Sequence, residues 1–98
     1  MVTRKFDISE HLTDEVSIAE YLDACMEEGG PELFLKALGD AMKAVGVADI
    51  IKRAGIASRT SAYRSFSENG NPEVGTVEAV LEAMGMRLSV VPRRAHAA

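Results

Sequence analysis

The stretch ADIIKRAGIASRTSAYRSFS, residues 48–67, has the pattern of two short helices joined at a glycine. The first helix is predicted over 48–54, where apolar side chains recur on one face. They are Ile50, Ile51 and Ala54. Gly55 permits the left-handed backbone that a sharp turn needs, and Ile56 would close the turn against the core. Two short helices joined in this way are typical of a helix-turn-helix.

The second helix of the pair is predicted over 59–67, with Ser58 as its N-cap. Ala62 and Phe66 are four residues apart and would therefore seat this helix on the core through one face. The opposite face would carry side chains that bind phosphates and base edges in a DNA major groove. The predicted DNA-binding residues are Ser58, Arg59, Thr60, Ser61, Arg64 and Ser67, with Lys52 and Arg53 from the preceding helix.

Charge is distributed unevenly along this chain, whose net charge is −4. Residues 1–46 have four Lys or Arg against ten Asp or Glu, whereas residues 47–98 have seven against five. Residues 50–67 contain four basic side chains and no acidic one. Such a segment can bind a polyanion even in an acidic protein, although a solvated basic surface explains it equally well. Arg59 and Arg64 would lie about 140° apart on the helix, so one can reach a base while the other binds a phosphate.

The rest of the chain predicts three further helices, each with a start signal. They are 17–28 beginning at Ser17, 31–45 beginning at Pro31, and 77–84 capped by Thr76. The expected fold is therefore all-α, with five helices in a single domain that spans residues 1–98. Its expected parts are an N-terminal lead-in over 1–16, a helical core over 17–85, a strand over 86–91 and a flexible tail over 92–98.

The predicted strand over 86–91 rests on a change in the spacing of apolar residues, from a helical period to alternation. Met86, Leu88 and Val90 alternate with Arg87, Ser89 and Val91. A lone strand cannot satisfy its own backbone groups, and an exposed strand edge invites a partner. That partner is either a second copy of the chain or another protein, and the sequence leaves both possibilities open.

No set of residues predicts catalysis, a metal site or a cofactor site. His11 and His96 are far apart in the chain, whereas a metal site needs three or four converging ligands. Cys25 falls on the apolar face of the predicted first helix, which favours a place in the core. No apolar run reaches the roughly 18–20 residues of a membrane span, and no signal peptide is evident. We therefore expect a cytoplasmic protein that is not an enzyme.

The whole chain resembles the addiction-module antidote family, which consists of helix-turn-helix antitoxins of the λ-repressor-like type. The matching stretches are FDISEHL, IAEYLDACMEEGGPELFLKALGDAMKAVG and SENGNPEVGTVEAVLEAMGMRLSV, which together cover roughly residues 6–91. The resemblance implies a λ-repressor-like fold and a partner toxin similar to the RelE/ParE ribonuclease-like family. It also implies binding to operator DNA and autorepression of the shared operon. With it we expect a homodimer.

One position departs from the family's pattern. The family usually places an aromatic residue seven positions after the turn glycine, whereas Tyr63 lies eight after Gly55, and Ala62 stands where leucine is common. The longer segment bears on DNA binding more than on toxin binding, which depends on other parts of the chain. A DNA-binding antitoxin is therefore weighed against a protein-interaction module that binds its toxin without sequence-specific DNA binding.

Overall fold

The computed structural model describes residues 14–93. They form four helical elements, which are α2 (Glu15–Val45), α3 (Val47–Ala54), α4 (Arg59–Ser65) and α5 (Val74–Ala83). The described chain is therefore all-α, as the sequence predicted. Most of the expected lead-in and tail falls outside the described residues.

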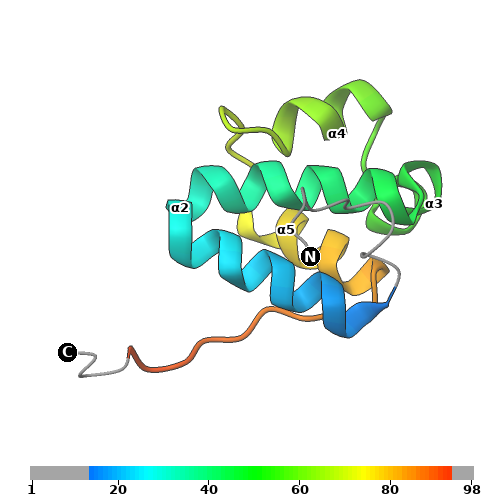
Figure 1. Ribbon diagram of the computed structural model, residues 1–98. Coiled ribbons are helices and arrows are strands. Elements are labelled where there is room, and N and C mark those ends of the chain that lie inside the picture. The colour runs from blue at the N-terminus through cyan, green and yellow to red at the C-terminus, as the bar shows by residue number, and fades with distance from the viewer. Residues whose placement is uncertain (1–13, 94–98) are drawn as a thin grey trace, which may run out of the picture.

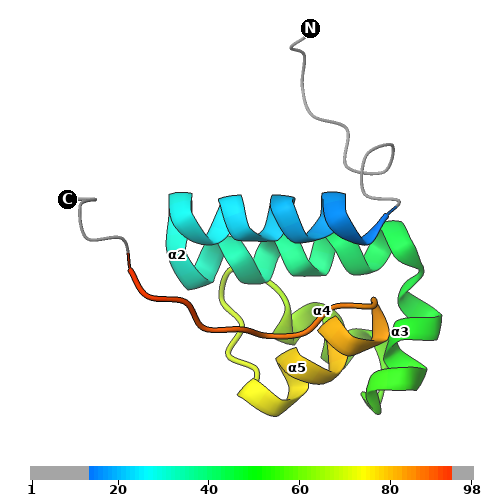
Figure 2. The ribbon, with the colours of Figure 1, turned by 90° about the horizontal axis from the view of Figure 1, so that it is seen from below.

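Element α2 is a helical hairpin because its backbone turns sharply at Gly30. Gly30 has φ 72° and ψ −159°, a backbone conformation that breaks the helix and that residues other than glycine rarely adopt. Pro31 follows and suits the first position of the second arm, where its missing N–H leaves no carbonyl unpaired. Figures 1 and 2 show the first arm (15–29) and the second arm (31–45) running antiparallel, side by side. The prediction of five helices is corrected to four elements, because the first two predicted helices are the arms of α2.

Two helix starts also differ from the predicted ones. Helix α2 is capped by Asp14, whose carboxylate accepts a hydrogen bond from the N–H of Ser17 at 2.8 Å, so Ser17 is not the cap. Helix α5 begins three residues earlier than expected, because the carbonyl of Glu73 already accepts hydrogen bonds from the N–H groups of Thr76 and Val77. Thr76 therefore lies inside α5 and does not cap it.

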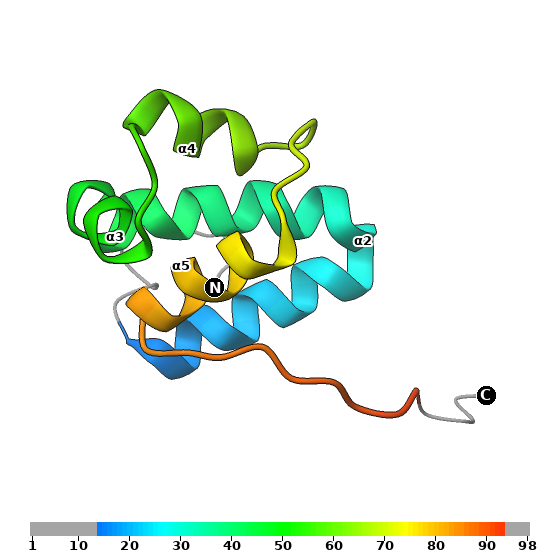
Figure 3. The same ribbon diagram turned by 180° about the vertical axis from the view of Figure 1, so that it is seen from behind.

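One hydrophobic core joins the four elements. Its largest fully buried side chains are Leu38, Met42, Ile50 and Val80, which come from the second arm of α2, from α3 and from α5. Helix α5 packs beside α3, and α4 lies on the second arm of α2, on the side away from the first arm (Figures 1 and 3). The surface of α4 is thus held at one side of the molecule by the core beneath it.

Residues 86–91 do not form the predicted strand. No strand occurs among residues 14–93, and within that range no backbone hydrogen bond involves residues 87–93. The segment instead runs outstretched along the molecule, on the side opposite α4 (Figures 1 and 2). The prediction is wrong for a single copy of the chain, because the described part of the chain offers no neighbouring strand to complete a ladder.

Helix α4 approaches α2 closely at Gly39. A methyl group on the buried Gly39 would overlap the backbone carbonyl oxygen of Phe66, the residue that ends α4. The Phe66 side chain is only 4% exposed and belongs to the core. The absence of a side chain at Gly39 therefore sets how closely α4 approaches the hairpin.

Gly39→Ala is expected to lower the free energy of unfolding by about 1–3 kcal/mol, because the added methyl group overlaps a backbone atom that cannot rotate away. Gly75→Ala is the matched control: it lies in α5, and its methyl group would meet no heavy atom within 4 Å. The control should leave stability unchanged or raise it by up to about 1 kcal/mol. Urea denaturation followed by circular dichroism measures both, and equal losses would contradict the close approach.

Candidate nucleic-acid interface

The turn between α3 and α4 is closed by hydrogen bonds to the last turn of α3. Gly55 has φ 75° and ψ 26°, the left-handed conformation that the sequence predicted. Its N–H donates to the carbonyl of Lys52 at 3.3 Å, and the N–H of Ile56 donates to the carbonyl of Ile51 at 3.0 Å. These two bonds form a Schellman motif, which ends a helix and redirects the chain. Ile56 then packs against the core, as expected.

Ser58 is the N-cap of α4, in agreement with the prediction. Its side-chain oxygen accepts a hydrogen bond from the N–H of Ser61 at 3.1 Å, and its hydroxyl lies 3.3 Å from the Ser61 hydroxyl oxygen, to which it donates. Both hydroxyl groups therefore stabilise the first turn of α4. At the other end, the Ser67 hydroxyl donates to the carbonyl of Arg64 at 3.0 Å. These three predicted residues serve the helix itself.

The outer face of α4 carries the exposed polar residues. Ala62 and Phe66 face the core and are 1% and 4% exposed. At about 100° per residue, Thr60 and Arg64 lie on the opposite side of the helix, and both are exposed. Arg59 is also exposed, in the first turn. The structure thus brings three predicted base- or phosphate-binding residues together on one short helix.

Of the basic residues predicted to bind DNA, one forms an ion pair within the described chain and three do not. Nε of Arg53 lies 3.2 Å from Oδ2 of Asp49, and its Nη1 donates to the carbonyl of Ala83 at 3.4 Å. Ala83 ends α5, and a positive charge is favourable at a helix C-terminus. Arg53 therefore links α3 to α5. The remaining basic residues have no ion-pair partner within residues 14–93; they are Lys52, Arg59 and Arg64.

Lys43 is a further basic residue at this surface, and the sequence analysis missed it. Its Nζ lies 5.1 Å from the centre of the Tyr63 ring, within the range of a cation–π interaction. Lys43 stands in the acidic half of the chain, far from Tyr63 in sequence, so neither spacing nor charge placed it beside α4. The groove next to it, of about 340 Å³, also contains Asp40 and Glu68, which limit the positive surface on that side.

Other candidate chemistry finds little support in the described chain. Within residues 14–93, no group of His, Cys, Asp or Glu is arranged to hold a metal ion, while His11 and His96 lie outside that range. Cys25 packs against the core next to Tyr21. Burial, with contributions from Cys25 and Asp40, raises the pKa of Tyr21 to about 12. None of the described helices has the length and apolar character to cross a membrane.

Ser58→Ala is expected to lower the free energy of unfolding by about 1 kcal/mol, because the first turn of α4 loses the acceptor of the Ser61 N–H. Ser58→Asp should keep most of the stability, since aspartate caps helices as well as serine does. Thermal denaturation of the two variants beside the wild type measures the difference. If Ser58→Ala were as stable as Ser58→Asp, the capping bond would contribute nothing.

Comparisons with known proteins cover nearly the whole chain. Residues 2–92 match the family described as "Probable addiction module antidote protein". A protein of Haemophilus influenzae, strain Rd, described as "Uncharacterized protein", is 40% identical over 91 residues, which is 93% of each chain. No solved structure gives a significant match. The chain therefore belongs to the family of probable addiction module antidote proteins.

Proposed function

We propose that this protein is the DNA-binding antitoxin of a type II toxin–antitoxin module. It acts in the cytoplasm as a homodimer, neutralises a toxin similar to the RelE/ParE family and represses its own operon. The proposal assigns it no catalytic step and no cofactor. Membership of the antidote family supports the antitoxin role. The observation that carries the DNA-binding role is the exposed outer face of α4, with Thr60 and Arg64, on a helix seated by its opposite face.

Each residue of this surface has a chemically suitable partner on DNA. A guanidinium binds guanine O6 and N7 with two hydrogen bonds, and a threonine contacts either base type, so Arg64 and Thr60 would read base edges. Arg59, Lys52 and Lys43 would bind phosphates on either side of the groove. Arg53 is already engaged with Asp49 and the end of α5, so we assign it mainly to positioning.

A dimer would place α4 of each copy in successive major grooves of a palindromic operator. In helix-turn-helix dimers the two half-sites lie about 34–36 Å apart, one turn of DNA. The helix pair α3–α4, with its Schellman turn and its capped second helix, supports this mode of docking. The operator would then have two half-sites, each contacted by one α4.

Toxin neutralisation is assigned to the acidic half of the chain. The first arm of α2 is rich in exposed carboxylates, which are Glu15, Glu20, Asp23, Glu27 and Glu28. A ribonuclease-like toxin must bind the phosphates of RNA, so its active surface is expected to be basic. Complementary charge of this kind steers association and gives specificity.

One observation favours the alternative of an interaction module that binds its toxin but no specific DNA. Tyr63, which lies one position later than the family's aromatic residue, is 41% exposed and is covered by Lys43 instead of entering the core. An exposed aromatic side chain beside the outer face of α4 would alter how α4 enters a groove. Binding to operator DNA distinguishes this module from the repressor.

Arg64→Ala and Arg59→Ala should each weaken binding to promoter DNA by about 10- to 100-fold, since each removes a charge from α4. Lys36→Ala removes an exposed positive charge that already pairs with Asp40 at 3.3 Å, and it should have a much smaller effect. Fluorescence anisotropy on promoter and scrambled DNA, across a salt series, measures affinity and specificity. Loss of sequence preference should be largest for Arg64→Ala. If the wild-type protein showed no preference for promoter DNA over scrambled DNA, the repressor role would be wrong and the interaction module would be the remaining function.

Glu20→Ala combined with Glu27→Ala should slow association with the toxin of the same operon and reduce the salt dependence of the rate, because rim charges act mainly on the association rate. Glu78→Ala combined with Glu82→Ala removes two exposed carboxylates from α5 and serves as the control. Surface plasmon resonance measures both pairs. Unchanged rates in the first pair would place the toxin elsewhere on the molecule, whatever the result with DNA.

A further inference from the structure

The segment after α5 leaves the helix in a fixed direction but has no hydrogen-bond partner. The N–H of Met86 donates to the carbonyl of Leu81 at 2.8 Å, and the N–H of Gly85 donates to Glu82, which gives a second Schellman motif. Beyond it, residues 87–93 make no backbone hydrogen bond within the described chain. Val90 is 95% exposed, and Val91 is also exposed. An outstretched segment with free backbone groups and two exposed valines has the features of an unpaired strand.

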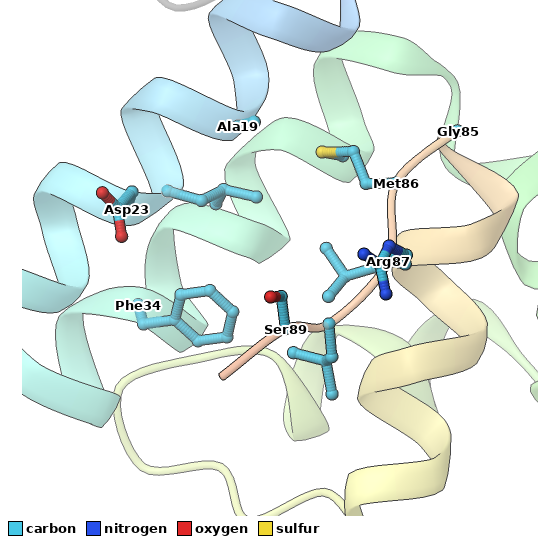
Figure 4. Close-up of a pocket in the computed structure, with 10 residues that line it drawn as sticks. Ala19, Asp23, Phe34, Gly85, Met86, Arg87 and Ser89 are labelled. Atoms are coloured by element: carbon cyan, nitrogen blue, oxygen red, sulfur yellow. The ribbon is translucent and has the colours of Figure 1, made fainter. Parts of the chain in front are cut away.

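A groove of about 640 Å³ lies between this segment and the first arm of α2. Figure 4 shows Phe34 and Ser89 facing each other across it, with Asp23 on the first arm and Met86 at its upper end. Apolar side chains form much of its lining; they are Leu22, Phe34, Leu81, Met86 and Leu88. An extended chain with apolar side chains on one face would fit beside the segment and over this lining.

We propose that a second copy of this chain fills the groove, through an antiparallel pairing of residues 87–91 with the same residues of the other copy about a two-fold axis. The surface is self-complementary, as such an axis requires. The segment is basic and apolar, with Arg87, Arg93 and the two valines, whereas the first arm beside it is acidic, with Glu15 and Asp23. The inference rests on the proposed homodimer, but it needs neither DNA binding nor toxin binding.

The chemistry of the segment selects one register. A two-fold pairing with the axis normal to the strands places one residue opposite itself, and in this segment that residue is Ser89. Pro92 has no N–H, and the N–H of Met86 is already bonded, so the pair of positions 86 and 92 must be one without hydrogen bonds. Alternation then gives hydrogen-bonded pairs at 89 with 89 and at 87 with 91. Centring on residue 90 would set Arg87 opposite Arg93, and like charges directly opposite are destabilising.

This register also buries the exposed side chains. Leu88 of one copy lies opposite Val90 of the other in a pair without hydrogen bonds, where side chains are closest. Val90 of the second copy would therefore cover Leu88 at the groove. Arg93 of the second copy would lie opposite Gly85, and a methyl group at Gly85 would overlap the Glu15 carboxylate, so Glu15 is at hand to pair with it. Helix α4 lies on the other side of the molecule and stays uncovered (Figure 1).

The first experiment measures the dimer dissociation constant of the full chain, without DNA or toxin, by sedimentation equilibrium. Val90→Glu should raise this constant by at least about tenfold, because the pairing would bury a charge against apolar groups. The matched control is Val74→Glu, since Val74 is another valine that is highly exposed, at 72%, in the first turn of α5. Neither change touches the core, so both variants should fold. A dimer equally tight in both variants would overturn the proposal.

A second experiment reads the register through disulfide formation in a Cys25→Ala background, which removes the native cysteine. Ser89→Cys should cross-link two copies under mild oxidation, because a hydrogen-bonded pair has its Cα atoms about 5.5 Å apart, within disulfide range. Val90→Cys should not, because its two copies would lie diagonally, roughly 7–8 Å apart. Rapid cross-linking of Val90→Cys in place of Ser89→Cys would overturn the register.

The remaining outcomes distinguish a second copy of the chain from the toxin as the partner that fills the groove. A wild-type chain that stays monomeric up to about millimolar concentration would overturn the second copy as occupant, while operator and toxin binding would still be measured independently. If Val90→Glu left self-association intact and weakened only toxin binding, the toxin would be the occupant and the proposal would be wrong. Dimerisation lost in Val90→Glu and kept in Val74→Glu supports it.

Discussion

The approach of α4 to the hairpin at Gly39 is the contact on which the candidate DNA surface depends. A seven-residue helix has too few hydrogen bonds to persist alone, since isolated helices shorter than about 12–15 residues are marginal in water. Phe66 anchors its end in the core, Ala62 keeps its buried face small, and Gly39 leaves its backbone room. The orientation of Arg64 and Thr60 is therefore a property of tertiary packing, even though both residues belong to a local motif.

The same packing explains which parts of the site were predictable. Gly55, Ile56 and Ser58 act on residues within five positions of themselves, through a left-handed turn, a Schellman bond and a cap. Interactions between residues so close in the chain can be recognised from the sequence, and the roles of all three residues were predicted. Arg53 reaches a carbonyl 30 positions away, and Lys43 covers a ring on another helix. No local pattern indicates such partners, so the sequence analysis did not predict the contact of Arg53 with α5 and did not include Lys43.

The errors in the fold have similar causes. Asp14 and Ser17 are both good caps three residues apart, and the structure gives the cap to Asp14 because its carboxylate accepts the Ser17 N–H. The two predicted helices 17–28 and 31–45 correspond to the two arms, but the single non-helical residue between the arms, Gly30, joins them into one element. The alternation over 86–91 correctly marked a segment that is not helical. It failed as a strand because a strand is defined by its neighbour, and the described chain contains none.

That missing neighbour bears on how a chain of this size is stabilised. A domain of about 100 residues buries well under 70% of the surface of its unfolded chain, so its core is thin, and here it leaves a groove open beside the first arm. Pairing two copies at that groove would extend the core without covering α4, because the two surfaces lie on opposite sides of the molecule. The acidic outer face of the first arm would then be repeated on each copy. In this arrangement DNA and the second copy contact opposite sides of each chain, so a change in the paired segment would affect operator binding only through loss of the dimer. Glu15 and Asp23 border the groove and also belong to the acidic surface assigned to the toxin, so the dimer surface and the toxin surface adjoin each other.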